Sequence, residues 1–160
     1  AEAMGRARGT TRTCLEEVRR ISQRLRPGVL ADLGLLNSLS SLASDLTART
    51  GMPVTRGFVP GLPPLTPESE RVVYRVAQEA LTNVVRHARA TAGSLGLARV
   101  GDSVVLTVTD DGTGGADVRR GTGIHGMHER AQMVGGSLTV ATPDGGGTTV
   151  RLSVPAAGTP

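Results

Sequence analysis

Apolar residues recur along this chain with two different spacings, which predict helices in some segments and strands in others. Stretches with an apolar residue at every third or fourth position are typical of helices that bury one face, and they cover residues 10–26, 32–50 and 66–88. Shorter stretches rich in β-branched residues predict strands at residues 54–59, 92–98, 104–109, 138–142 and 148–154. A last, short helix is predicted over residues 126–134.

Capping residues set the limits of these helices. Asp32 is expected to cap the second helix, which Gly51 ends. The third helix has three start signals. Thr66 supplies a capping hydroxyl, Pro67 stands at the first helical position, and Glu68 places an acid in the first turn. The first two helices cannot bury both apolar stripes alone, so we expect them to pack on the domain that follows, on a partner chain, or on both.

The strand predicted at residues 104–109 ends in two acids whose side chains should point opposite ways. Alternation places Val104, Leu106 and Val108 on one face, and Asp110 continues that face to the mouth of the apolar layer. A carboxylate there needs hydrogen-bond donors. The glycines that follow let the backbone approach a ligand and offer N–H groups to an anion; they stand at positions 112, 114, 115, 121, 123 and 126. This combination favours a nucleotide site, and a flexible surface loop is the other interpretation.

A polar stripe on the third helix is the second candidate for chemistry. Arg75, Glu79, Asn83 and His87 stand four residues apart and therefore stack on one side of the helix. Asparagine is unusual in mid-helix, and Glu79 and Asn83 present two oxygens one turn apart, which suits a Mg²⁺ ion that bridges to phosphates. A solvated helix face is the alternative. The buried face beside it is predicted to hold Val73, Ala77, Ala80, Leu81, Val84 and Ala88.

Composition and charge narrow the classes of function. The net charge is +4, and all 18 basic residues are arginines that are scattered along the chain. Phe58 and Tyr74 are the only aromatic residues, whereas a single-stranded nucleic-acid surface interleaves basic and aromatic residues. Cys14 is the single cysteine, which excludes an internal disulfide, and the three histidines lack zinc spacing. No apolar run is long enough to span a membrane. We therefore expect no nucleic-acid partner and no membrane contact by this chain.

Four motifs together resemble the ATP-binding domain of sensor histidine kinases, in the GHKL superfamily. EALTNVVRHA at residues 79–88 resembles the N box and DDGTG at residues 110–114 the G1 box. GTGIHGMHER at residues 121–130 is similar to the G2 box of the kinases that partner NarL-type regulators, and GTTV at residues 147–150 to the closing motif. LRPGVLADLGL at residues 25–35 resembles the segment that joins the dimerisation helices to the catalytic domain. The resemblance spans about residues 10–155.

The resemblance implies a two-layer α/β (α+β) sandwich, the Bergerat fold, preceded by N-terminal helices and binding ATP and Mg²⁺. Asp110 would accept a hydrogen bond from the adenine amino group, supported by Thr148. Asn83 would ligate Mg²⁺, and Glu79 would position the metal or a water, so these two are the implied catalytic residues. Several residues would shape the lid and contact the nucleotide, with backbone N–H groups on the phosphates: Gly112, Gly114, Gly121, Gly123, Gly126 and Met127.

Three further residues keep two interpretations each. His87 matches an N-box position, where it would either contact a phosphate or have a structural role. Arg119 and Arg120 stand in the short lid, where they would meet the γ-phosphate or remain solvated.

The phosphoacceptor histidine of this family precedes an acidic residue, and this chain has no such site. His87 is followed by alanine, and His128, which precedes Glu129, belongs to the G2 box. We therefore expect a piece of a longer protein that starts after the His box, binds ATP and does not phosphorylate itself in cis. The implied partners are a phosphoacceptor dimerisation helix, in a cytoplasmic homodimer, and a response regulator.

The resemblance to the kinase family also implies a division of the chain into domains. Residues 1–50 would hold part of the dimerisation region and the connector, residues 51–155 the ATP-binding domain, and residues 156–160 a disordered tail.

Three other functions are open at this point. Residues 121–126 satisfy the G-x-G-x-x-G fingerprint of dinucleotide-binding proteins, and Asp144 follows at a suitable distance, but six residues separate the fingerprint from Gly114 and its strand. A degenerate, non-catalytic interaction module and an anti-sigma-type serine kinase of the same superfamily are the other two.

Overall fold

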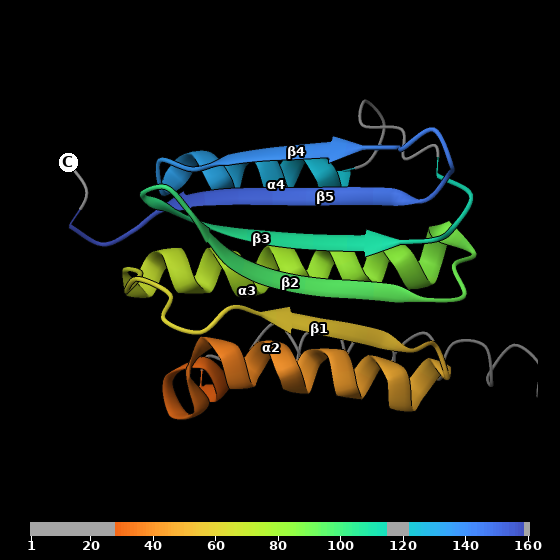
Figure 1. Cartoon of the computed structure of the whole chain (residues 1–160), viewed down its shortest axis with the longest axis horizontal. Helices are drawn as coiled ribbons and strands as arrows, with labels where there is room; N and C mark the ends of the chain where they lie inside the picture. The colour runs from red at the N-terminus through yellow and green to blue at the C-terminus, as the bar shows by residue number, and fades with distance from the viewer. Residues whose placement is uncertain (1–27, 115–121, 159–160) are drawn as a thin grey trace, which may run out of the picture. The chain divides into compact units, whose positions relative to one another are not determined.

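The computed structural model describes residues 28–114 and 122–158, drawn in colour in Figure 1. The chain divides into two compact units, residues 1–34 and 35–160; the helix predicted at residues 10–26 lies outside the described residues. Helix α2 (Gly28–Thr50) is interrupted at Gly34, at the boundary of the units. The second unit then contains β1 (Val54–Phe58), α3 (Pro67–Asn83), the π-helix η1 (Val84–Ala88), β2 (Gly93–Val100), β3 (Ser103–Asp110), α4 (Thr122–Met133), β4 (Ser137–Ala141) and β5 (Thr148–Pro155).

The strands form one mixed sheet in the order β1-β2-β3-β5-β4. Strand β1 runs parallel to β2, and every other neighbouring pair is antiparallel. One row of paired residues crosses all five strands, and each member is apolar: Phe58, Leu97, Leu106, Leu152 and Leu138. This row anchors the core, because four of its members are buried and burial of apolar area is the main stabilising term in folding.

Helices α3 and α4 lie side by side on one face of the sheet, as Figure 1 shows. Helix α3 contacts the central strands β3 and β5, and α4 contacts β5 and β4. Strand β3 shows the predicted alternation in part: Val104, Leu106 and Val108 are buried on one face, and on the other face Val105 is also buried while Thr107 and Thr109 are half-buried. The result is the two-layer α/β sandwich that the sequence motifs implied.

Helix α2 is held to the edge strand β1 through Arg56. The Arg56 guanidinium donates to the Ser44 hydroxyl (3.1 Å) and to the Ser40 carbonyl oxygen (3.4 Å). The apolar side of this part of α2 is buried, through Leu35, Leu39, Ala43 and Leu46. Residues 35–50 therefore pack as a part of the second unit.

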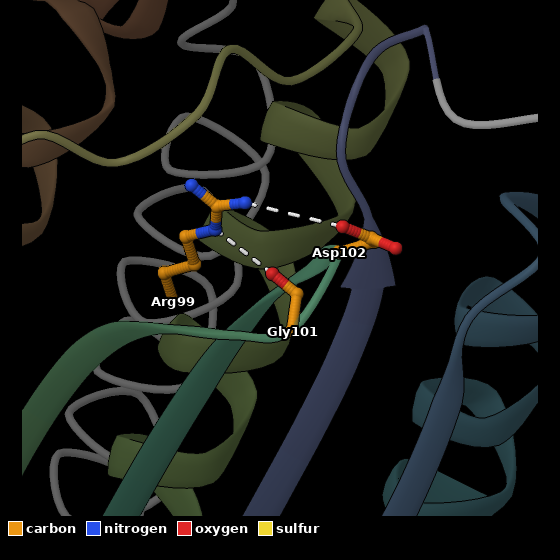
Figure 2. Close-up of polar contacts among 3 residues, drawn as sticks. All are labelled: Arg99, Gly101 and Asp102. Carbon is orange, nitrogen blue, oxygen red and sulfur yellow. Dashed lines mark hydrogen bonds and ion pairs between the residues drawn. The ribbon is translucent and has the colours of Figure 1, made fainter.

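Strands β2 and β3 form the predicted hairpin, with Gly101 in the left-handed conformation at its turn (φ 59°). Figure 2 shows how one arginine closes this turn. Arg99 donates through Nε to the Gly101 carbonyl oxygen (2.8 Å), and its guanidinium lies 3.9 Å from the Asp102 carboxylate. Both charged side chains are mostly exposed, so the ion pair contributes little to stability.

The structure corrects the predicted helix limits at three places. The third helix begins at its Thr66 cap as predicted, but it ends as an α-helix at Asn83 and continues as a π-helix to Ala88. The last helix begins at Thr122 rather than at Gly126, because close tertiary packing outweighs the poor helix propensity of glycine. Asp32 does not begin a helix, since α2 already includes it and breaks at Gly34.

The start of the C-terminal tail also differs from the expected disorder. The Ala156 backbone N–H donates to the Asp102 carbonyl oxygen (2.9 Å), and the Ala157 N–H donates to the Pro64 carbonyl oxygen (2.8 Å). These bonds give both backbone groups a partner, so residues 156 and 157 are fixed against two loops of the domain.

Candidate functional site

Three segments that carry the sequence motifs each have one end at the same side of the sheet, as Figure 1 shows. Strand β3 ends there at Asp110, α3 and η1 end there at Ala88, and α4 begins there at Thr122. The N, G1 and G2 motifs, far apart in sequence, therefore meet at one edge of the domain.

Asp110 is half-buried at the end of β3, next to Gly93 of β2 and Thr148 of β5. The Gly112 backbone N–H donates to Asp110 Oδ1 (2.8 Å) and thereby supplies a donor to this carboxylate. Because one oxygen is held by its own loop, the side chain has a defined direction, as a ligand-reading acid requires. Thr148, the predicted support of Asp110, is its direct cross-strand neighbour.

Three glycines let the backbone pack closely around Asp110. A Cβ on Gly112 would overlap the Ala88 carbonyl oxygen, and a Cβ on Gly147 would overlap the carbonyl oxygen of Asp110 itself. Gly147 also has a left-handed φ of 79°, and its N–H donates to the Gly112 carbonyl oxygen (2.7 Å). Gly114 is left-handed too (φ 66°), and a Cβ there would lie 2.8 Å from the Gly147 carbonyl oxygen. All three positions need glycine for space, and Gly114 and Gly147 need it for conformation as well.

Asp111 points away from Asp110 and binds the segment that follows η1. Its Oδ1 accepts from the backbone N–H groups of Thr91 (2.8 Å) and Ala92 (2.9 Å), and its Oδ2 accepts from the Thr91 hydroxyl. The Thr91 hydroxyl and these backbone donors lower the pKa of Asp111 below its usual value. Asp111 is therefore a carboxylate at neutral pH, held by three donors.

The predicted polar stripe is present on α3 as far as Asn83. Arg75, Glu79 and Asn83 are all half-buried, and Arg75 donates to the Gln78 side-chain oxygen (3.0 Å). Asn83 precedes η1 and makes no side-chain capping bond to it. His87 is exposed, because the wider π-helical turn shifts it from the four-residue spacing of the stripe. The face beside the stripe is buried as predicted, at Val73, Ala77, Ala80, Leu81, Val84 and Ala88.

The Glu79 carboxylate lies against the first turn of α4. A Cβ added to Gly123 would overlap Glu79 Oε1 and lie 3.3 Å from Glu79 Cδ. Glycine at position 123 therefore leaves room for the Glu79 carboxylate against the first turn of the G2 helix. The contact joins two motifs that are separated by more than thirty residues in the sequence.

The other G2 residues divide between the core and the surface. Met127 is fully buried and contributes to the core, together with Ile124 and Ala131 on the same face of α4. The Arg130 guanidinium lies against Gly126, at 3.1 Å from where a Cβ would stand. Outside the described residues lie Gly121, Arg119 and Arg120.

The donor set suits a magnesium ion that keeps most of its water. Within residues 28–114 and 122–158, no group of three or more histidine, cysteine, aspartate or glutamate side chains could hold a metal. Mg²⁺ is commonly held by one or two protein oxygens plus substrate phosphates, and the half-buried amide of Asn83 with Glu79 one turn away fits that pattern.

Sequence reasoning missed the partners of two residues. The strand alternation predicts only that Asp111 points away from Asp110 and does not indicate Thr91 or Ala92 as its partners. From the sequence, Gly147 is assigned only to the closing motif, although its place in a run of three glycines before a strand is a signal for close backbone approach. Both contacts join segments distant in sequence, so spacing alone does not reveal them.

The fold is an α/β sandwich in which a half-buried aspartate and several glycines lie at one edge of the sheet. Residues 68–158 match the family described as histidine kinase-, DNA gyrase B-, and HSP90-like ATPase. The chain belongs to this family. The dinucleotide alternative fails, because β3 is antiparallel to both of its neighbours whereas the dinucleotide-binding fold uses parallel strands.

Curated relatives of this chain are sensor histidine kinases. It is 34% identical over 147 residues to YxjM of Bacillus subtilis (strain 168), covering 90% of this chain and 35% of the relative. It is 36% identical over 148 residues to the signal transduction histidine-protein kinase/phosphatase UhpB of Salmonella typhimurium (strain LT2), covering 88% and 28%. The chain thus spans about a third of the length of these relatives.

Solved structures agree on the fold. The blue-light activated histidine kinase EL346 of Erythrobacter litoralis matches with a TM-score of 0.63 at 25% identity, over 74% of this chain and 41% of that one. The Acinetobacter baumannii histidine kinase AdeS matches with a TM-score of 0.65 at 14% identity, over 92% and 84%, and supports the fold alone. Among the described residues, no helix has the length and apolar character needed to cross a membrane.

Proposed function

We propose that this chain is the ATP-binding catalytic domain of a two-component sensor histidine kinase. It binds ATP with Mg²⁺ and donates the γ-phosphoryl group to a histidine on a dimerisation helix of the longer, homodimeric protein, for onward transfer to a response regulator in the cytoplasm. The single observation that carries the proposal is the meeting of three motifs at one edge of the sheet: Asp110 at the end of β3, the N-box helix end, and the start of α4. In the same proposal, residues 1–50 include part of the dimerisation region.

Each part of this edge has a task in ATP binding. Asp110, held by the Gly112 N–H, accepts from the adenine amino group, with Thr148 beside it. Backbone N–H groups of the glycine-rich segments and the start of α4 face the phosphates, because the N-terminus of a helix favours anions. His87 is exposed near the end of η1 and belongs to the phosphate side.

Asn83 would hold the Mg²⁺ ion, and Glu79 would orient it or a bound water. When bound, the metal neutralises charge on the phosphates. The protein holds the nucleotide in one reactive orientation, and such positioning lowers the barrier of a phosphoryl transfer.

Transfer to a substrate supplied in trans tests this proposal. The chain is incubated with radiolabelled ATP, Mg²⁺ and a separate dimerisation segment that carries a His box, and a segment with that histidine replaced serves as the control. We expect acid-labile label on the intact segment only. A second reaction supplies a sigma-antagonist serine substrate in place of the segment, and acid-stable label on that substrate would instead establish the serine-kinase alternative. ATP binding without transfer to either would leave an interaction module.

Gly123→Ala is expected to lower this transfer without destabilising the protein. Alanine favours a helix by about 1 kcal/mol over glycine, but its Cβ would displace the Glu79 carboxylate. The transfer rate at saturating ATP–Mg²⁺ should fall between about tenfold and 100-fold, since small misplacements in a site cost that much. Thermal unfolding should occur at the same temperature as in the parent chain or higher.

Gly145→Ala is the matched control, because a Cβ at Gly145 meets no atom within 4 Å. It should transfer phosphate as the parent does. A Gly123→Ala variant with parental transfer rates would show that the placement of Glu79 is not needed.

A further inference from the structure

Asp111 joins the loop after β3 to the chain that follows the N-box helix. Its carboxylate accepts from the Thr91 N–H, the Ala92 N–H and the Thr91 hydroxyl. In return, the Asp111 N–H donates to the Ala92 carbonyl oxygen (3.3 Å). One exposed side chain thus ties together two segments that lie about twenty residues apart in the sequence.

The neighbouring residues extend this junction. The Thr113 N–H donates to the Ala88 carbonyl oxygen (2.8 Å), and Gly112 lies so close to Ala88 that a Cβ there would overlap it. Between the two points of attachment, Arg89 has a left-handed φ of 51°, which is unfavourable for a residue with a Cβ and persists when surrounding contacts hold it. The Asp111 carboxylate directly binds Thr91 and Ala92, which stand two and three residues after Arg89.

The two groups proposed to contact the nucleotide and its metal, Asp110 and Asn83, lie on the two different segments that this junction joins. Asp110 immediately precedes Asp111, and Asn83 immediately precedes η1, which ends at Ala88. Any change in the junction therefore alters the position of the Asn83 helix end relative to Asp110. Since Asp111 is ionised at neutral pH and charge-assisted hydrogen bonds are stronger than neutral ones, it is suited to keep that position constant.

We propose that Asp111 is a positioning residue that sets the N-box helix end, with Asn83, relative to the purine-reading Asp110. This inference rests on the proposed function. Its consequence is specific: Asp111 governs how strongly Mg²⁺ tightens ATP binding, because that effect needs both ends of the nucleotide to be engaged at once. Adenosine engages the Asp110 side alone and depends little on Asp111.

Calorimetric titrations with adenosine, ATP, and ATP with Mg²⁺ test this inference on the parent chain and on Asp111→Ala. In the variant, the factor by which Mg²⁺ tightens ATP binding should fall about tenfold, while adenosine affinity changes by less than about threefold. Asp111→Asn retains an oxygen that can accept from both N–H groups, and it should recover most of the magnesium effect.

Asp102→Ala is the matched control. Asp102 stands at the other end of the β2–β3 hairpin, where its carboxylate contacts Arg99 at 3.9 Å (Figure 2). It should bind all three ligands as the parent does. If Asp111→Ala does not fold, Thr91→Val provides a milder variant, because it removes only the hydroxyl donor. In Thr91→Val the factor by which Mg²⁺ tightens ATP binding should also fall, but by less.

The outcomes separate the possible roles. Equal weakening of adenosine and ATP–Mg²⁺ by Asp111→Ala would assign the residue to general support of the purine loop and overturn the proposal. Parental values for all three ligands would overturn it as well. A parent chain that binds neither adenosine nor ATP would instead overturn the proposed function, on which this inference depends.

Discussion

Replacing Asp110 with asparagine is expected to weaken ATP binding by about 1 to 3 kcal/mol, which corresponds to about 5- to 150-fold in affinity. The reason is the loss of a charged acceptor for the adenine amino group. Asparagine has nearly the same shape, so the half-buried site at the end of β3 should be preserved. Calorimetric titration with ATP measures the change, and adenosine should lose affinity by a similar factor because it carries the same amino group.

Asp144→Asn is the control for this change, since it removes the same charge at an exposed position between β4 and β5. It should bind ATP with the affinity of the parent. An Asp110→Asn variant that binds adenosine and ATP as tightly as the parent would show that another group reads the purine.

Gly147→Ala is expected to destabilise the fold by about 3 kcal/mol, the largest stability effect that we predict. The left-handed φ of 79° costs about 1–2 kcal/mol in a residue with a Cβ. The Cβ would also overlap the Asp110 carbonyl oxygen, and such overpacking typically costs about 1–3 kcal/mol. Urea unfolding measures the free-energy difference. The loss of affinity for ATP should accompany it, because relief of the overlap moves Asp110.

Gly61→Ala separates the two causes. Gly61 has a similar left-handed φ of 73°, but a Cβ there meets no atom within 4 Å. It should lose only the conformational part, about 1–2 kcal/mol. Equal losses in both variants would show that the contact with Asp110 adds nothing.

The strands and the position of Asp110 could be predicted because they depend on local alternation. Val104, Leu106 and Val108 define the buried face of β3, and Asp110 continues it to the sheet edge. The cap at Thr66 was likewise readable, since its side chain accepts from the Ser69 N–H only three residues away (3.1 Å). Such short-range signals predict the strands and the start of the third helix, whereas the two layers were implied by the resemblance of the four motifs to the kinase family.

The remainder depends on contacts between segments distant in sequence. Helix α4 begins four residues before the predicted start, because helix propensity carries no information on the close approach of Gly123 to Glu79. The π-helical end of the N box, which leaves His87 exposed, is likewise not predictable from the local pattern. The partners of Asp111 follow from the path of the chain after η1, which no periodicity specifies.

Titration calorimetry of the chain with ATP, in the presence and absence of Mg²⁺, tests the central claim most directly, with Asn83→Ala measured in parallel. We predict one ATP bound per chain, tighter binding with Mg²⁺, and loss of that tightening in Asn83→Ala while adenosine still binds. Absence of ATP binding, or an identical magnesium effect in the variant, would contradict the assignment of this sheet edge as an ATP–Mg²⁺ site.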